Sequence, residues 1–217
     1  MESKGSAATQ AQQGSWMKVV SGVAGLLLLL GGVAVQPAVA GGATEAMKHT
    51  IEEVLTTIQD KELKQPGRAE ARRQRLEQIV GARFDYQEMS KRSLGAPWNT
   101  LSDKDKQEFV ALFQTLLTNS YADKIESYSG EGVKYINERT ENDYAEVRTK
   151  VLTGKVEIPL DYRLLNKGGD WRVYDVVVDG VSLVNNYRGQ FSKILRSSTY
   201  ADLVDQLRKK SDKIKVQ

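Results

Sequence analysis

Few residues in this chain could carry out catalytic chemistry. His49 is the only histidine, and the chain has no cysteine. Thiolate catalysis and metal sites built from cysteine and histidine are therefore excluded. No serine sits in a nucleophile-elbow sequence, and no glycine-rich phosphate loop ends in a lysine. We interpret His49 as an ordinary surface or core residue, and we predict no catalytic residue, no metal and no cofactor.

Asp175 and Asp179 form one acidic pair that calls for an explanation. They are predicted to lie on one face of a strand, opposite Tyr174, Val176 and Val178. Four residues of strand separate them by about 13 Å. Glycosidase carboxyl pairs lie about 5 Å or about 6.5–9.5 Å apart. We therefore interpret the two aspartates as partners of arginine or lysine on a solvated face, or as caps of a turn.

Along the sequence, the predicted helices that would position such residues come before and after a group of predicted strands. Apolar residues recur at helical spacing in 44–63, 69–80 and 84–94, and in a long segment after Ser102. Ser102 and Asp105 resemble a capping box at the start of that long helix. Ser182 starts another helix, and a last amphipathic helix ends in a basic tail.

Between these helices the period of the apolar residues changes from 3.6 to 2. Four strands are predicted at 133–139, 144–152, 156–165 and 171–178, with glycine-containing turns between the last three. Val147, Thr149 and Val151 alternate with charged residues, so one face of the sheet is apolar and the other is solvated. The fold class is therefore α+β, an antiparallel meander sheet whose apolar face is covered by helices.

The first forty residues have the pattern of a secretory signal peptide. A positive start at Lys18 precedes an apolar run over 19–35, and small residues in 37–40 place the cleavage site after Ala40. The alternative is an uncleaved anchor, but the run is short for a membrane span and several glycines dilute it. Either Met1 or Met17 is the start. We predict a signal peptide over 1–40 and one mature domain over 41–217.

The charge of the mature domain is nearly balanced. Removing Lys4, Lys18 and Glu2 from the 31 basic and 28 acidic residues leaves 29 and 27, a net charge of +2. A general nucleic-acid binder needs a strongly basic surface, so nucleic acid is excluded as a partner. The length suits one domain with its own core, and we expect a monomer.

Several segments resemble the MlaC family, also known as the toluene-tolerance Ttg2-type periplasmic proteins. Phe84-Asp85-Tyr86 with Met89, Leu94-Gly95 and Trp98 is similar to the family's opening signature. The stretch 171–191, which runs from Trp171-Arg172-Val173-Tyr174-Asp175 to Asn186-Tyr187-Arg188 and Phe191, is the most specific part. The resemblance covers about 45–208.

The resemblance implies a periplasmic, non-enzymatic phospholipid carrier. Such proteins move glycerophospholipid between an outer-membrane lipoprotein complex and an inner-membrane ABC transporter complex. Their fold resembles the nuclear-transport-factor cone, with the acyl chains between sheet and helices. Three alternatives stay open: a hopanoid-associated, HpnM-like carrier, a hydrolase or isomerase on a cone-like fold, and a periplasmic interaction module with a solid core.

Alternation and helical spacing predict which residues line the lipid cavity, and charge predicts where partners dock. The predicted lining from the strands is Val147, Thr149, Val151, Ile158, Leu160, Tyr162, Tyr174, Val176 and Val178. The residues expected to face them from helices are Phe109, Phe113, Tyr187 and Phe191. The predicted docking residues are Arg68, Arg72, Arg73 and Arg75, with a second basic group at Arg208, Lys209, Lys210, Lys213 and Lys215.

Overall fold

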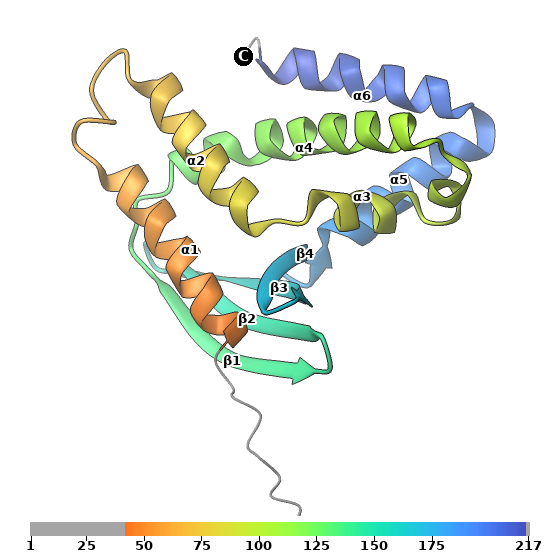
Figure 1. The fold of residues 1–217 in the computed structure, drawn as a ribbon. Helices are drawn as coiled ribbons and strands as arrows, with labels where there is room; N and C mark the ends of the chain where they lie inside the picture. The colour runs from red at the N-terminus through yellow and green to blue at the C-terminus, as the bar shows by residue number, and fades with distance from the viewer. Residues whose placement is uncertain (1–41, 216–217) are drawn as a thin grey trace, which may run out of the picture. The chain divides into compact units, whose positions relative to one another are not determined.

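The computed structural model describes residues 42–215 and confirms the order of helices, strands and helices (Figure 1). The first helices are α1 (Gly42–Gln59), α2 (Ala69–Arg83), α3 (Tyr86–Leu94) and α4 (Asp103–Glu126), with a 3-10 turn η1 (Ala96–Thr100) before α4. The strands are β1 (Val133–Glu141), β2 (Tyr144–Thr153), β3 (Val156–Lys167), β4 (Asp170–Val178) and β5 (Val181–Ser182). Helices α5 (Leu183–Ser197) and α6 (Tyr200–Lys215) follow. The predicted signal peptide lies outside the described residues.

Short polar side chains set the ends of several helices. Ser102 caps α4 by accepting a hydrogen bond from the Asp105 N–H at 3.2 Å. Its hydroxyl donates to the Asp105 carboxylate at 2.6 Å. In a full capping box, a glutamate side chain accepts a hydrogen bond from the backbone N–H of the cap residue. Here the Asp105 carboxylate accepts from the Ser102 hydroxyl instead, because aspartate is shorter than glutamate. Helix α1 ends at Gln59, earlier than predicted, since the Asp60 carboxylate accepts backbone N–H groups that follow it.

The five strands form an open, curved antiparallel meander in the order β1-β2-β3-β4-β5 (Figure 1). Strands β2 and β3 stay in register from Tyr144 opposite Leu165 to Thr153 opposite Val156. The two-residue turn between them starts at Gly154, whose φ of 56° suits glycine. Strand β5, which was not predicted, has only two residues and pairs with the end of β4.

Two β-bulges change which side chains share a face. In β4, Asp175 lies opposite Arg163 while Val173 lies opposite Leu164, so Tyr174 is an extra residue. A bulge turns two consecutive side chains to the same side. Tyr174 therefore lies on the face of Asp175, and the prediction that it shares a face with Val176 is wrong. In β1, Ile136 is the extra residue of a similar bulge.

Most of the buried apolar residues form two clusters. The first, here called the sheet core, packs α1 onto one face of the sheet; it consists of Ala43, Met47, Ala145, Val147, Tyr162, Leu164, Val173 and Val176. The second, the helical core, joins α3, α4, α5 and α6; its largest members include Met89, Trp98, Phe109, Phe113, Tyr187, Phe191 and Leu203. Phe84, between α2 and α3, packs against both cores.

Arg83 at the end of α2 holds this junction together. Its guanidinium donates to the Thr50 hydroxyl on α1 at 3.0 Å and to the Trp171 carbonyl on β4 at 2.6 Å. It also pairs with Asp170 at 3.0 Å. One side chain therefore fixes two helices against the sheet. Within 42–215, no helix combines the length and apolar character that crossing a membrane requires.

Candidate functional site

The face of the sheet that α1 covers, here called the inner face, carries three aligned rows of side chains. Strand register places Val147, Tyr162 and Val176 side by side across β2, β3 and β4. The next row is Thr149, Leu160 and Val178, and the last is Val151 and Ile158. Eight of the nine strand residues predicted to line a cavity therefore share one face; Tyr174 is the exception.

Exposure rises along these rows towards the β2–β3 turn. Val147 is completely buried under α1, whereas Leu160 and Val178 are half-buried and Ile158 is 36% exposed. The apolar surface thus continues from the sheet core to side chains that are only partly covered. Exposed apolar patches often mark interaction sites, and ligand sites are lined mostly by apolar side chains. We call the half-buried and exposed residues, Val151, Ile158, Leu160 and Val178, the open strip.

Two tyrosines and one threonine on the inner face are neutral at physiological pH. Burial raises the pKa of the Tyr162 phenol. Burial also raises the pKa of Tyr135 on β1 to about 12, with a contribution from nearby glutamates. The Thr149 hydroxyl donates to the Leu160 carbonyl. The strip is therefore uncharged, which suits an apolar ligand rather than an ionic one.

The four helical aromatics lie elsewhere than predicted. Phe109, Phe113, Tyr187 and Phe191 belong to the helical core, not to the core on the inner face. Phe113 meets Tyr187 edge-on at 5.0 Å between ring centres, and Phe109 meets Phe191 edge-on at 5.6 Å. Such contacts join α4 to α5. These aromatics do not lie opposite the strand residues in this structure, because a helical aromatic stripe does not reveal which element it packs against. Their contact with lipid stays a prediction.

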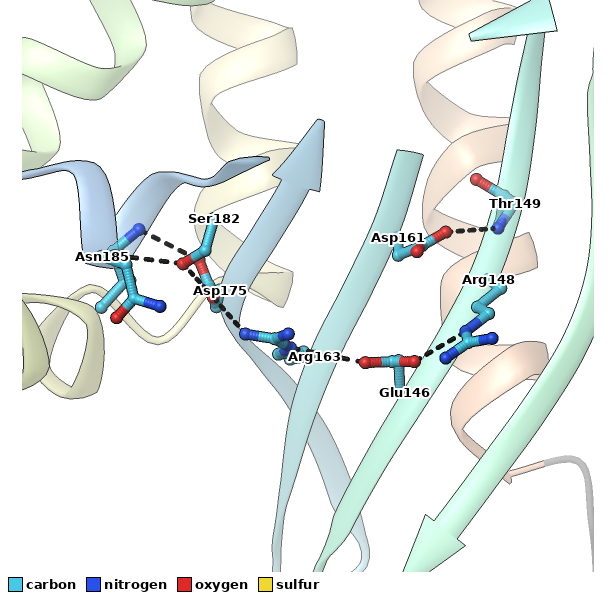
Figure 2. Close-up of polar contacts among 9 residues, drawn as sticks. Glu146, Arg148, Thr149, Asp161, Arg163, Asp175, Ser182 and Asn185 are labelled. Carbon is cyan, nitrogen blue, oxygen red and sulfur yellow. Dashed lines mark hydrogen bonds and ion pairs between the residues drawn. The ribbon is translucent and has the colours of Figure 1, made fainter. Parts of the chain in front are cut away.

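The opposite, outer face of the sheet carries a chain of charged side chains (Figure 2). Arg148 bonds Glu146 at 2.7 Å, Glu146 bonds Arg163 at 3.4 Å, and Arg163 bonds Asp175 at 3.1 Å. The hydrogen bond and charge of Arg148 lower the pKa of Glu146, with help from Arg163. The predicted solvated face is confirmed.

Asp175 fulfils both roles that the sequence suggested for it. It pairs with Arg163, and it also accepts hydrogen bonds from the Ser182 hydroxyl at 2.7 Å and the Val184 N–H at 3.0 Å, at the start of α5. Asp179 lies beyond the end of β4 in an exposed turn with φ of 49°. The expectation that both aspartates lie on one strand is therefore wrong.

Three of the four predicted docking arginines lie in ion pairs between helices. Arg72 bonds Glu126 on α4 at 2.7 Å, and Arg73 bonds the same carboxylate at 3.2 Å. Arg68 is exposed, and the Arg75 side chain is 54% exposed with Glu53 at 3.9 Å. In the tail, Arg208 pairs with Glu108 and Lys209 with Asp205, Lys210 is exposed, and the side chains of Lys213 and Lys215 lie outside the described residues. Docking by either group stays a prediction.

His49 lies on the exposed side of α1. Its Nδ1 is 3.3 Å from the Glu53 carboxylate, and its side chain is 71% exposed. It belongs to neither core, so it does not supply the base that a hydrolase or isomerase would need on the inner face. Among the described residues, no group of three or more histidine, aspartate or glutamate side chains could hold a metal ion.

Comparison with known proteins gives the same family from sequence and from structure. Over 99 residues the chain is 26% identical to the intermembrane phospholipid transport system binding protein MlaC of Haemophilus influenzae. The aligned stretch covers 43% of this chain and 46% of that protein. It is 23% identical to the toluene tolerance protein ttg2D of Pseudomonas putida over 79% of this chain and 81% of the relative.

A solved structure agrees with these relatives. The phospholipid-binding protein of Ralstonia solanacearum, described in complex with a phospholipid, superposes with a TM-score of 0.72 at 26% identity, covering 79% of this chain and 98% of that one. The family model described as MlaC protein matches residues 48–209. The match spans more than half of the chain, which therefore belongs to the MlaC family.

Proposed function

We propose that this protein is a periplasmic phospholipid carrier, and that the acyl chains of the bound phospholipid lie along the open strip of the inner face. The observation that carries the proposal is the continuous apolar surface from Val147, fully buried, to Ile158, 36% exposed. Membership of the MlaC family and the phospholipid complex of the Ralstonia protein support it. The proposal includes export through a cleaved signal peptide and exchange of lipid with an outer-membrane lipoprotein complex and an inner-membrane ABC transporter complex.

The chemistry of the strip favours hydrocarbon and leaves the head group in water. Each methylene removed from water contributes about 0.8 kcal/mol, so chains that lie along the strip gain free energy in proportion to their length. Tyr135 and Tyr162 stay neutral, so nothing on the strip selects a charged head group. We therefore expect a preference for acyl chains and little discrimination between head groups.

Native mass spectrometry of protein from a periplasmic extract tests export and lipid binding together. We expect a polypeptide mass that begins at Gly41, and additional mass that corresponds to phospholipid of mixed chain length. A hopanoid mass instead would favour the HpnM-like alternative. Protein that begins at Gly41 but carries no lipid, and takes none from liposomes, would contradict the carrier and leave export intact.

A matched pair of variants tests the position of the lipid. Ile158→Gln places an amide on the open strip, whereas Ile136→Gln makes the same change where the β1 bulge leaves the side chain 54% exposed outside the sheet core. We expect Ile158→Gln to lower bound lipid several-fold, and more so when combined with Leu160→Gln, because an amide in an apolar site costs about 1–3 kcal/mol. Ile136→Gln should retain lipid. Equal lipid content in both proteins would show that the strip is assigned to the wrong face.

A further inference from the structure

A groove on the outer side of the sheet has no role in lipid binding as proposed above. It has a volume of about 570 Å³ and lies where α3 and the first turns of α5 meet β3 and β4. Its charged lining consists of Lys91, Arg92, Arg163 and Arg188 with Glu88 and Asp175. Four cationic groups therefore face two carboxylates.

Ion pairing inside the groove leaves Arg188 unpaired among the described residues and Lys91 only at the edge of an ion pair. Asp175 is committed to Arg163 at 3.1 Å, and its side chain is only 4% exposed. Glu88 bonds Arg92 at 2.7 Å and lies 3.8 Å from Lys91. Arg188 packs over Gly95 and, among the described residues, has no ion-pair partner. Lys91 and Arg188 thus give the groove a local excess of positive charge.

Tyr174 lines the groove, and Tyr144 lies beside it just outside the lining. The guanidinium of Arg92 lies 4.1 Å from the centre of the Tyr174 ring, and Tyr144 meets Tyr174 edge-on at 5.9 Å. Tyr144 is 44% exposed, although it is a large residue on a strand. The bulge in β4 is what turns Tyr174 to this side. Tyrosine and arginine together are the residues that dominate the binding energy of protein interfaces.

We propose that this groove docks an acidic segment of a partner protein. Lys91 and Arg188 would bind its carboxylates, and Tyr144 and Tyr174 would contact the apolar parts of its side chains. A phosphate site would need buried donors that converge on one point, whereas Lys91 and Arg188 are both exposed. A flat bilayer surface would not enter a recess. Because the groove lies behind the inner face, docking leaves the open strip uncovered.

Titration of the isotope-labelled mature protein with a hexaglutamate peptide tests the proposal by NMR. We expect the backbone amide signals that shift to be those lining the groove, Gly95, Asn99 and Asn185 first. The double variant Lys91→Glu, Arg188→Glu should weaken binding roughly tenfold or more. The control Lys104→Glu, Arg196→Glu makes the same change in net charge at exposed positions outside the groove and should bind as the unchanged protein does.

Other outcomes of the same titration would overturn the docking proposal. Inorganic phosphate that shifts the same amides as strongly as the peptide would make the groove a small-anion site. Selective binding of vesicles with anionic lipids through these amides would make it a membrane contact. Equal loss of peptide binding in both double variants would reduce the effect to net charge. Bound lipid, measured in parallel, should be unchanged in both variants, so a folding defect or a failed carrier function is distinguished from failed docking.

Discussion

At the scale of single residues, Asp175 connects the outer face of the sheet to the helices. One of its carboxylate oxygens accepts the Val184 N–H, and the other accepts the Ser182 hydroxyl and pairs with Arg163 (Figure 2). The Val184 N–H lies at the start of α5, where a helix leaves donors without partners of its own. A single carboxylate thus fixes the direction in which α5 leaves the sheet.

The substitution Asp175→Asn should lower the free energy of unfolding by about 1–3 kcal/mol, because it leaves Arg163 without its buried partner. Urea denaturation followed by circular dichroism measures the change. Asp179→Asn is the matched control, since its exposed turn at φ of 49° accepts asparagine readily. We expect a change within about 0.5 kcal/mol there. Similar losses in the two variants would mean that the cap and the ion pair contribute little.

The sequence indicated the roles of Asp175 but not the face of Tyr174, its neighbour. Alternation locates a side chain only when the two faces of a strand differ in polarity. In β4, valines lie on both sides of the bulge, at Val173, Val176 and Val177, and all three are buried. An extra residue therefore leaves no mark in the pattern, and only hydrogen-bond register reveals it.

At the scale of elements, α2 and α4 are joined by one shared carboxylate. Glu126 accepts from Arg72 at 2.7 Å and from Arg73 at 3.2 Å, and its own side chain is 15% exposed. Burial by itself would raise the pKa of Glu126, but the hydrogen bonds and charges of the two arginines outweigh burial and lower it. Arginines that look like a docking patch in the sequence are thereby part of the helix packing.

The lowered pKa of Glu126 determines how the free energy of unfolding changes with pH. Because the folded-state pKa of Glu126 is lower than the unfolded value, the pairing stabilises the protein above the unfolded value and is lost as pH falls through the folded value. Glu126→Gln should cost roughly 1–2 kcal/mol at pH 7. The difference from the unchanged protein should shrink in acid, below the ordinary glutamate pKa of 4.5. Urea denaturation across this pH range measures it.

Asp123→Asn is the control for that series. Asp123 also bonds Arg73, at 3.2 Å, but its side chain is 91% exposed. An exposed pair contributes little, so we expect a change within about 0.5 kcal/mol at every pH. A Glu126→Gln difference that stayed constant from neutral to acid pH would show that packing, rather than charge, accounts for the loss.

The elements themselves were largely predictable, since each has a clear period and recognisable ends. Helix α4 begins at its serine cap, and β2 and β3 meet at a glycine turn. The partners of each helix were not predictable. Phe109 and Phe113 show that a face of α4 is buried, but their neighbours Tyr187 and Phe191 come from a helix more than 70 residues later in the chain.

At the scale of the whole described domain, the apolar residues that the sequence predicts as one buried set divide between two cores. Sequence patterns report how many residues must be buried, not how they divide between clusters. Here the helices α3 to α6 complete one core among themselves, while α1 is the one helix that contributes fully buried residues to the sheet core, against which Phe84 and Leu183 also pack. That division leaves Val151, Ile158, Leu160 and Val178 without a complete cover. The proposed lipid site is therefore a consequence of how the two cores divide.

The same division predicts how lipid leaves the protein. Two sixteen-carbon chains represent roughly 25 kcal/mol of gross apolar burial, so release of a diacyl lipid into water is too slow to serve as the route. Transfer must occur on contact with an acceptor. With a fluorescent phospholipid and acceptor liposomes, we therefore expect the transfer rate to rise in proportion to liposome concentration.

A lysophospholipid supplies the matched control, because its single chain removes about half of that apolar burial. It escapes through water more easily, so its transfer rate should depend much less on liposome concentration. The variant Ile158→Gln should hold both lipids more weakly and move the diacyl lipid towards the same behaviour. A diacyl transfer rate that did not change with acceptor concentration would mean that the lipid leaves through water. The open strip would then hold it far less tightly than its apolar surface implies.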